Sequence, residues 1–189
     1  MSKTFLVSDT HFGHLGVCKF MRADGITKLR PWDSVEAMDL ELIARWNSVV
    51  GVNDKVYHLG DVVINRKALE VLHRLNGTKV LIKGNHDIFK LTDYTAYFKD
   101  IRAYHVLDNM LLSHIPVHPS SKGRFKANIH GHTHANRIML ASDPTSVDPF
   151  YQCVSVEQID YTPIEFGALQ NKLLKEISPD KPAAPIPRS

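Results

Sequence analysis

The sequence places a polar cluster directly after each of three short, β-rich apolar runs, Lys3–Val7, Lys55–Leu59 and Thr78–Ile82. Apolar runs of this length are typical of buried parallel strands. Helical patterns separate the runs, which gives the order β-α-β-α-β with short connections. Right-handed crossovers bring such strands together in one parallel sheet. Because ligands bind beyond the carboxyl ends of strands in open α/β sheets, the sequence predicts an α/β fold with a polar site at that edge.

Two segments between these strands carry the helical pattern. Apolar residues recur at helical spacing over residues 35–50, where Asp33 opens a capping box and Gly51 ends the helix. Asn65 provides the cap for a second helix over residues 66–75. The apolar stripe of the first helix belongs to the core rather than to a cofactor site.

The pattern changes in the second half of the chain. Two strands, over residues 101–107 and 110–113, flank Asp108-Asn109, which is typical of a two-residue hairpin turn. The remaining predicted elements are a flexible basic loop over residues 120–126, a short strand over 127–129, a late strand over 151–156 and a helix that begins at Thr162-Pro163.

Length and composition describe an ordinary globular domain. The chain has 189 residues, of which 43% are hydrophobic and 23% charged, and a net charge of +3. We expect one domain over residues 1–178 and a flexible Pro- and Ala-rich tail over 179–189. The two cysteines are too few for a disulfide scaffold or a thiolate zinc site. The apolar segments are too short to cross a bilayer, so a cytoplasmic protein without a membrane partner is expected.

The polar clusters contain residue types that bind metal ions. Asp9 and His11 lie two positions apart after the first strand, and Asp61 follows the second. Carboxylates and imidazoles suit borderline divalent ions such as zinc, manganese or iron. Three alternating histidines, at 130, 132 and 134, follow the strand at 127–129 and indicate metal binding more strongly. Each cluster taken alone also fits a polar turn, and Asp87 alone fits a helix cap.

The complete set of motifs is more specific than any one of them. It comprises Asp9-x-His11, Gly60-Asp61, Gly84-Asn85-His86-Asp87, a single His114 and Gly131-His132-x-His134. In this order the motifs resemble those of the calcineurin-like metallophosphoesterase superfamily, over residues 7 to about 160. The sequence is most similar to small bacterial and phage-type members, whose first motif has the Ser-Asp-Thr-His-Phe-Gly-His of residues 8–14.

The resemblance implies a four-layer αββα sandwich with two divalent metal ions, which could be manganese, iron, zinc or nickel. It assigns Asp9, His11 and His134 to one ion, Asn85, His114 and His132 to the other, and Asp61 to a bridge between them. Two carboxylates against two divalent ions leave a positive surplus, which attracts phosphate and lowers the pKa of bound water.

The implied activity is that of a phosphoric ester hydrolase. A hydroxide that two metal ions activate would cleave phosphodiester or phosphomonoester bonds of small substrates, with nucleotides as one candidate class. His86 would be the catalytic residue beside the leaving group. The candidates for orienting ligands or contacting substrate are His14, His58, Asp87 and Arg124.

Several alternatives stay open at the level of sequence. Serine/threonine protein phosphatases continue the second motif as Gly-Asp-x-x-Asp-Arg-Gly, whereas Val62–Arg66 follows Asp61 here, which argues against that activity. A nuclease for single-stranded nucleic acid, a non-catalytic binding protein with the same fold and a structural single-zinc protein are the other hypotheses. Substrate, native metal and oligomeric state are left undetermined.

Overall fold

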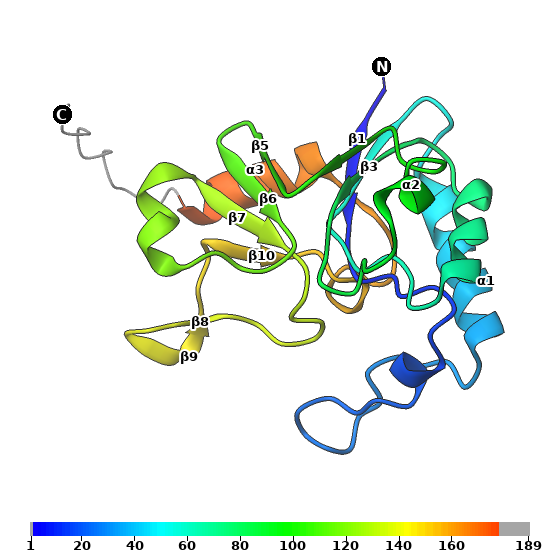
Figure 1. The fold of residues 1–189 in the computed structure, drawn as a ribbon. Helices are drawn as coiled ribbons and strands as arrows, with labels where there is room; N and C mark the ends of the chain where they lie inside the picture. The colour runs from blue at the N-terminus through cyan, green and yellow to red at the C-terminus, as the bar shows by residue number, and fades with distance from the viewer. Residues whose placement is uncertain (1, 178–189) are drawn as a thin grey trace.

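The computed structural model describes residues 2–177, so the predicted tail over 179–189 lies outside the described residues. The fold is a mixed α/β arrangement of two main sheets (Figure 1). The first sheet has the strand order β11-β1-β2-β3-β4. Its strands are β1 (Thr4–Val7), β2 (Lys55–His58), β3 (Thr78–Ile82), β4 (Asp100–Arg102) and β11 (Ile164–Glu165). Strands β1 to β4 are parallel, as the sequence predicted for the first three, and β11 joins β1 in antiparallel orientation.

Helices cover one face of this sheet. They are the short 3₁₀ helix η1 (Leu15–Cys18), α1 (Val35–Val49), the 3₁₀ helix η2 (Arg66–Arg74) and α2 (Leu91–Tyr94). The apolar stripe of α1 packs with the outward side chains of β1 and β2 in one core cluster, which confirms its structural role. Asn65 caps η2 as predicted, accepting a hydrogen bond from Ala68 N–H at 3.0 Å.

The prediction for the start of α1 was wrong by one residue. Ser34, not Asp33, is the cap, and its hydroxyl accepts a hydrogen bond from Ala37 N–H at 3.1 Å. The Asp33 carboxylate instead pairs with the Lys28 ammonium group. Serine and aspartate are both good N-cap residues.

The second sheet has the order β10-β7-β6-β5. Its strands are β5 (Tyr104–Leu107), β6 (Met110–Ser113), β7 (Ala127–His130) and β10 (Tyr151–Cys153). Asp108 and Asn109 have φ angles of 47° and 63°, as a two-residue hairpin turn requires, so this prediction is confirmed. The strand predicted over residues 101–107 is divided: β4 pairs with β3 in the first sheet, and β5 pairs with β6 in the second.

Two other predictions are corrected. Residues 120–124 of the predicted flexible basic loop (120–126) belong to the 3₁₀ helix η3 (Pro119–Arg124), where Lys122 pairs with the Asp148 carboxylate. The last helix, α3 (Phe166–Ile177), begins later than Thr162 because Ile164 and Glu165 first pair with β1. The other described elements are the hairpin of β8 (Met139–Leu140) and β9 (Asp143–Val147), and the 3₁₀ helix η4 (Val156–Gln158).

A second apolar cluster joins the two sheets. Leu6, Tyr57 and Val80 of the first sheet contact the cluster that contains Leu112 and Ile129 of the second, and α3 adds three apolar side chains. The sheets therefore share a core, and the strand ends of both lie around one region. Among residues 2–177, no helix is long and apolar enough to span a membrane.

Candidate metal centre

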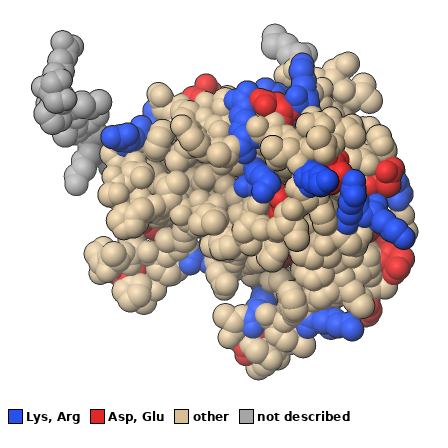
Figure 2. All heavy atoms as spheres, in the orientation of Figure 1, with Lys and Arg blue, Asp and Glu red and all other residues tan. Residues whose placement is uncertain are grey.

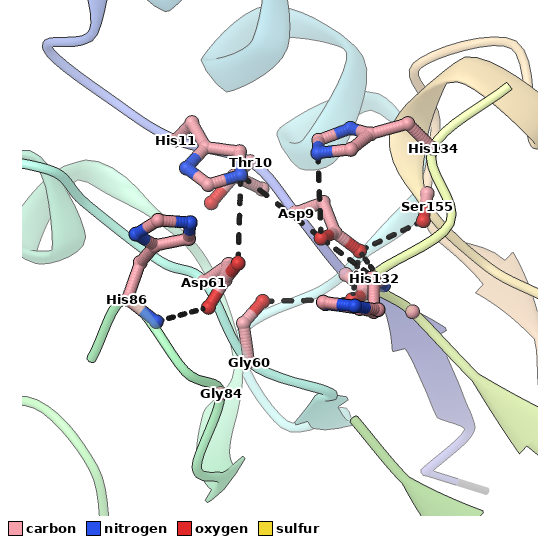
Figure 3. A network of polar contacts seen from close by, with 12 residues as sticks. Asp9, Thr10, His11, Gly60, Asp61, Gly84, His86, His132, His134 and Ser155 are labelled. Atoms are coloured by element: carbon pink, nitrogen blue, oxygen red, sulfur yellow. Dashed lines mark hydrogen bonds and ion pairs between the residues drawn. The ribbon is translucent and has the colours of Figure 1, made fainter. Parts of the chain in front are cut away.

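The loops that follow five parallel strands converge on one site, which Figure 3 shows in close-up. The first sheet supplies Asp9 and His11 after β1, Asp61 after β2, and Asn85 after β3. The second sheet supplies His114 after β6, and His132 and His134 after β7. Every metal position predicted from sequence is thus at the expected sheet edge.

The backbone at these positions is unusual. Five candidate ligands have left-handed φ angles: Asp9 (57°), His11 (48°), Asp61 (58°), His132 (68°) and His134 (50°). This region is uncommon for residues other than glycine, and strain of this kind concentrates at functional sites. Backbone hydrogen bonds hold the loops in place: Asp9 N–H donates to Gly60 O at 3.0 Å, and His11 N–H donates to Asp61 O at 3.1 Å.

Two glycines in the motifs are required by close packing. A Cβ atom on Gly131 would lie 1.9 Å from Ser8 Oγ and 2.5 Å from Asp9 Oδ2. A Cβ atom on Gly84 would lie 2.3 Å from Asp61 Oδ1. The loops can therefore approach the carboxylates only because these positions have no side chain.

Asp9, His11 and His134 form one group of potential ligand atoms. Asp9 Oδ1 lies 4.0 Å from His11 Nε2 and 3.9 Å from His134 Nε2. The other oxygen, Oδ2, accepts hydrogen bonds from Ser155 Oγ at 2.8 Å, from His132 N–H at 2.9 Å and from Ser8 Oγ. These bonds orient the carboxylate so that Oδ1 faces the two imidazoles (Figure 3).

Asp61 connects this group to a second one. Its Oδ2 atom lies 3.7 Å from His11 Nε2 and 3.5 Å from His114 Nε2. Atoms that share an ion at about 2.0–2.2 Å cannot lie more than about 4.4 Å apart, and both distances meet this limit. Asp9 also belongs to the second group, with Asp61 and His114, which the sequence did not predict.

Asn85 and His132 lie next to His114 and offer two further potential ligands. Asn85 Oδ1 lies 2.8 Å from His114 Nε2 and 2.9 Å from His132 Nδ1. His114 Nδ1–H donates to Leu59 O at 2.7 Å, so Nε2 is the ring nitrogen that faces Asp61 and Asn85. A carbonyl acceptor on one ring nitrogen is how proteins commonly fix the tautomer of a metal-binding histidine.

His86 and Asp87 have different positions relative to this cluster. The His86 side chain is exposed, with its ring 5.7 Å from that of His11, and its backbone N–H donates to Asp61 Oδ1 at 2.8 Å. Asp87 is buried and does not cap a helix. Its carboxylate accepts hydrogen bonds from Asp61 N–H at 2.9 Å, Val62 N–H at 3.0 Å and Gly84 N–H at 2.8 Å. Asp87 therefore fixes the backbone of two ligand loops.

The other candidates from sequence are His14, His58 and Arg124. His14 is half-buried, with its ring 5.7 Å from that of His11. His58 lies beneath the site, where its Nε2–H donates to Thr10 Oγ1 at 2.9 Å because the Thr10 hydroxyl donates to Val62 O. Arg124 is exposed on η3, and no hydrogen bond or ion pair among the described residues joins it to the cluster.

Sequence reasoning missed Glu157 and Arg30. Glu157 Oε1 accepts from His134 Nδ1 at 3.2 Å and from Arg30 Nε at 2.9 Å. Arg30 is fully buried and also donates to the backbone carbonyls of Thr10, at 2.7 Å, and Asp9. Glu157 follows β10, which is parallel to β7 and ends at the same edge, but no motif in the sequence marks either residue.

The pKa values of the cluster residues shift in both directions. Burial raises the pKa of Asp9, and hydrogen bonds and charges of nearby carboxylates raise the pKa values of His114 and His134 against the effect of burial. Burial lowers the pKa of His11 to about 2, so its imidazole is neutral at physiological pH. Burial alone would raise the pKa of Asp61, but the hydrogen bond and charge of His114 bring it down to about 2. For Glu157, burial is likewise outweighed by the hydrogen bond from His134, which leaves a pKa of about 2.

The donor set fits divalent cations. Asp9 and Asp61 are almost fully buried, and the ion pairs that reach them come from histidines. Buried carboxylates are costly unless they are paired with charge or bind a metal. Oxygen and imidazole nitrogen ligands around two neighbouring points therefore match metal ions better than an apolar or anionic ligand.

Fold and site together define a mixed α/β protein with an aspartate- and histidine-rich candidate metal centre at the sheet edge. The sequence matches no protein-family model. It is 35% identical over 179 residues to the uncharacterized protein MJ1445 of Methanocaldococcus jannaschii. The matched region covers 89% of this chain and 90% of that protein. The chain therefore belongs to the same family as MJ1445.

A phage protein and a solved structure also match most of this chain. The gene 66 protein of Mycobacterium phage L5 is 31% identical over 177 residues, covering 74% of this chain and 81% of the phage protein. The solved structure of AQ665 from Aquifex aeolicus, a protein of unknown function, matches with a TM-score of 0.64 and 25% identity. That match covers 91% of this chain and all of the AQ665 chain (100%).

Proposed function

We propose that this protein is a metal-dependent phosphoesterase that hydrolyses phosphodiester or phosphomonoester bonds of small substrates. The observation that carries the proposal is the position of Asp61, whose Oδ2 atom lies within 3.7 Å of His11 Nε2 and 3.5 Å of His114 Nε2. A carboxylate between two imidazoles from different sheets has the placement that a bridging ligand needs. Nucleotides are the candidate substrate class that we develop below.

Asp9, His11 and His134 would hold one ion, Asn85, His114 and His132 the other, and Asp61 would contact both. When bound, two divalent ions would position the oxygens of a phosphoester and make a water molecule acidic enough to act near neutral pH. Manganese, iron, zinc and nickel all accept these ligands. The shared core of the two sheets also supports the four-layer αββα sandwich as the complete architecture.

The role of the chain's own residues follows from their contacts. Asp87 holds the backbone of Asp61 and Gly84, so the bridging position and the loop with Asn85 keep a fixed relation. Glu157 holds His134 through Nδ1, which directs Nε2 toward Asp9. These buried contacts keep the ligands in place before substrate arrives, and such preorganisation lowers the cost of reaching the transition state.

His86 is the proposed general acid. Its ring is exposed and lies beside the cluster, and a completed ligand set does not require it. A proton on its imidazole would pass to the oxygen of the departing alcohol as the phosphorus–oxygen bond breaks. The chemistry needs such a group for poor leaving groups, since an alkoxide does not depart readily without a proton.

Hydrolysis assays with defined metal content test the proposal. The purified chain would be stripped with a chelator, dialysed, and reloaded separately with manganese, iron, zinc and nickel. Each preparation would then be assayed on bis-p-nitrophenyl phosphate and p-nitrophenyl phosphate. We expect hydrolysis that is lost on stripping and restored by at least one metal. Absence of hydrolysis with every metal, or full activity in the stripped protein, would contradict the proposal.

A further inference from the structure

A hairpin-like segment stands next to the candidate metal centre. This segment, Phe20–Leu29, is called the arm below, and it is the blue loop that projects from the body of the molecule in Figure 1. Its two halves are joined by hydrogen bonds from Leu29 N–H to Phe20 O and from Arg22 N–H to Thr27 O, each 2.7 Å. At the tip, Asp24 accepts from Ile26 N–H and Thr27 N–H, each at 2.9 Å. The arm therefore has a defined conformation of its own.

The base of the arm is anchored to the metal loops. Arg30 directly follows it, is fully buried, and donates to the backbone carbonyls of Asp9 and Thr10. The same guanidinium pairs with Glu157, which contacts His134. Because these contacts tie the arm to ligand loops of both sheets, its position relative to the candidate ions is fixed by buried interactions.

A pocket lies between the arm and the loop that follows β7. Its volume is about 450 Å³. The arm contributes Phe20, Met21 and Arg22 to its lining, and the loop contributes His132, His134 and Asn136. His132 and His134 are candidate metal ligands, so the pocket borders the metal centre. Figure 2 shows the arm as a separate lobe below the body, with an indentation beside it.

The pocket presents an aromatic ring near the point where a phosphate would bind. Phe20 is 52% exposed, and its ring lies nearly perpendicular to that of His14, with the ring centroids 5.8 Å apart. The His14 ring lies 5.7 Å from that of His11, so Phe20 is separated from the candidate ligands by one side chain. A Cβ atom on Gly16 would lie 2.6 Å from His14 Nε2 and 3.2 Å from Phe20 Cζ. Glycine at this position thus allows the two rings to pack together.

We propose that this pocket binds the nucleobase of a nucleoside phosphate, with the base stacked on Phe20 and the phosphate at the metal centre. The inference rests on the proposed phosphoesterase function and names its substrate class. A pocket of this volume suits a small organic group, and every nucleobase has a flat face that stacks on aromatic side chains. The Asn136 amide, which makes no side-chain hydrogen bond within the described part of the chain, supplies a donor and an acceptor for the base edge. An alkyl group would use neither the ring face nor this amide.

Binding of two phosphonates that cannot be hydrolysed tests the inference. The probes are the isosteric phosphonates of AMP and of ribose 5-phosphate, titrated calorimetrically into the manganese-loaded full chain. Stacking on one aromatic ring typically changes affinity by at least about fivefold. We expect the AMP analogue to bind at least about tenfold more tightly than the ribose analogue. We also expect Phe20→Ala to remove most of this difference.

Two further variants make the test specific. Phe20→Tyr keeps the ring and should keep the preference for the base. Ile26→Ala removes an apolar side chain that is 85% exposed on the same arm and does not line the pocket, so its affinities should match the wild type. Equal affinities for the two probes in the wild type would overturn the inference. A preference that Phe20→Ala leaves intact would also overturn it, because the base would then bind elsewhere.

The hydrolysis assay separates this inference from the function on which it rests. If metal restores hydrolysis of p-nitrophenyl esters but the two phosphonates bind equally, the phosphoesterase proposal stands and the nucleobase pocket is refuted. Conversely, base-dependent binding that Phe20→Ala abolishes, without hydrolysis of any ester, would retain a nucleotide-binding pocket and refute the enzyme.

Discussion

One oxygen atom of Asp61 lies within reach of imidazoles from both sheets, 3.7 Å from His11 Nε2 and 3.5 Å from His114 Nε2. We expect Asp61→Asn to reduce metal content and turnover together, because the amide keeps the size but loses the charge that two ions would share. Metal per chain, measured by plasma mass spectrometry, and hydrolysis rate provide the two readouts. Asp108→Asn, in the β5–β6 turn, is the matched control. Normal metal content in Asp61→Asn would contradict a bridging role.

His86 should matter in proportion to the basicity of the leaving group. His86→Ala is expected to keep its metal content, since the exposed ring is not needed to complete either ligand group. General acid help is typically worth about 10²–10⁴-fold in rate. That loss should appear with alkyl or ribose phosphoesters and be small with p-nitrophenyl esters. Equal losses on both substrate types would assign His86 to phosphate binding instead, and loss of metal would make it a ligand.

Glu157 is expected to control the affinity of one metal position. Its Oε1 atom is the hydrogen-bond acceptor for His134 Nδ1–H at 3.2 Å. Residues in this position typically change metal affinity by about 10–100-fold when substituted. Glu157→Gln should therefore weaken one of two metal-binding steps, measured by competition with a chromophoric chelator. Glu165→Gln on the edge strand is the control. Unchanged affinity for both ions would show that the contact is structural only.

At the level of elements, the sequence predicted the strands that carry the motifs better than the contacts between distant segments. The three parallel strands and the Asp108-Asn109 turn were found because local patterns encode them. Glu157 was missed because its partner Arg30 is 127 positions away, and neither lies in a recognisable pattern. The division of residues 100–107 between two sheets was missed for a related reason, since β propensity does not specify which sheet a strand joins.

Helix α1 contains a carboxyl group whose titration affects stability. Asp39 accepts from Gly13 N–H at 3.1 and 3.2 Å, and burial raises its pKa to about 6 from an ordinary value of 3.8. Between these values the native state holds a proton that the unfolded chain has lost. The free energy of unfolding contributed by Asp39 therefore falls as pH rises from about 4 to about 6, and stays lower above pH 6.

Asp39→Asn removes this titration. The difference in stability between Asp39→Asn and the wild type should be near zero at pH 4 and should increase toward pH 7. The expected gain in the free energy of unfolding is on the order of 1 kcal/mol after allowance for solvent screening, and it raises the Tm of the variant. Thermal unfolding at several pH values measures the difference. A Tm difference that is independent of pH would rule out Asp39 as the cause.

At the scale of the molecule, the candidate centre joins the two sheets at their strand ends. Bound metal at about a thousand times its Kd stabilises a fold by about 4 kcal/mol, and for a protein of this size 1 kcal/mol shifts Tm by about 2–4 °C. Chelation should therefore lower Tm by about 10 °C. The same chelator saturated with manganese beforehand is the control. An unchanged Tm after the metal has been removed would show that the ions do not couple the sheets.

The late position of β11 in the chain affects how this protein is made on the ribosome. Strand β1 is among the first segments to emerge, but one of its two edges is covered only when residues 164 and 165 arrive. An unpaired strand edge is a template for association with other chains. Glu157 also emerges only a few residues before β11, so the nascent chain lacks the acceptor of His134 during the same interval. The edge of β1 is therefore covered, and the acceptor of His134 is supplied, at almost the same step of synthesis. A chain released before that step would have neither.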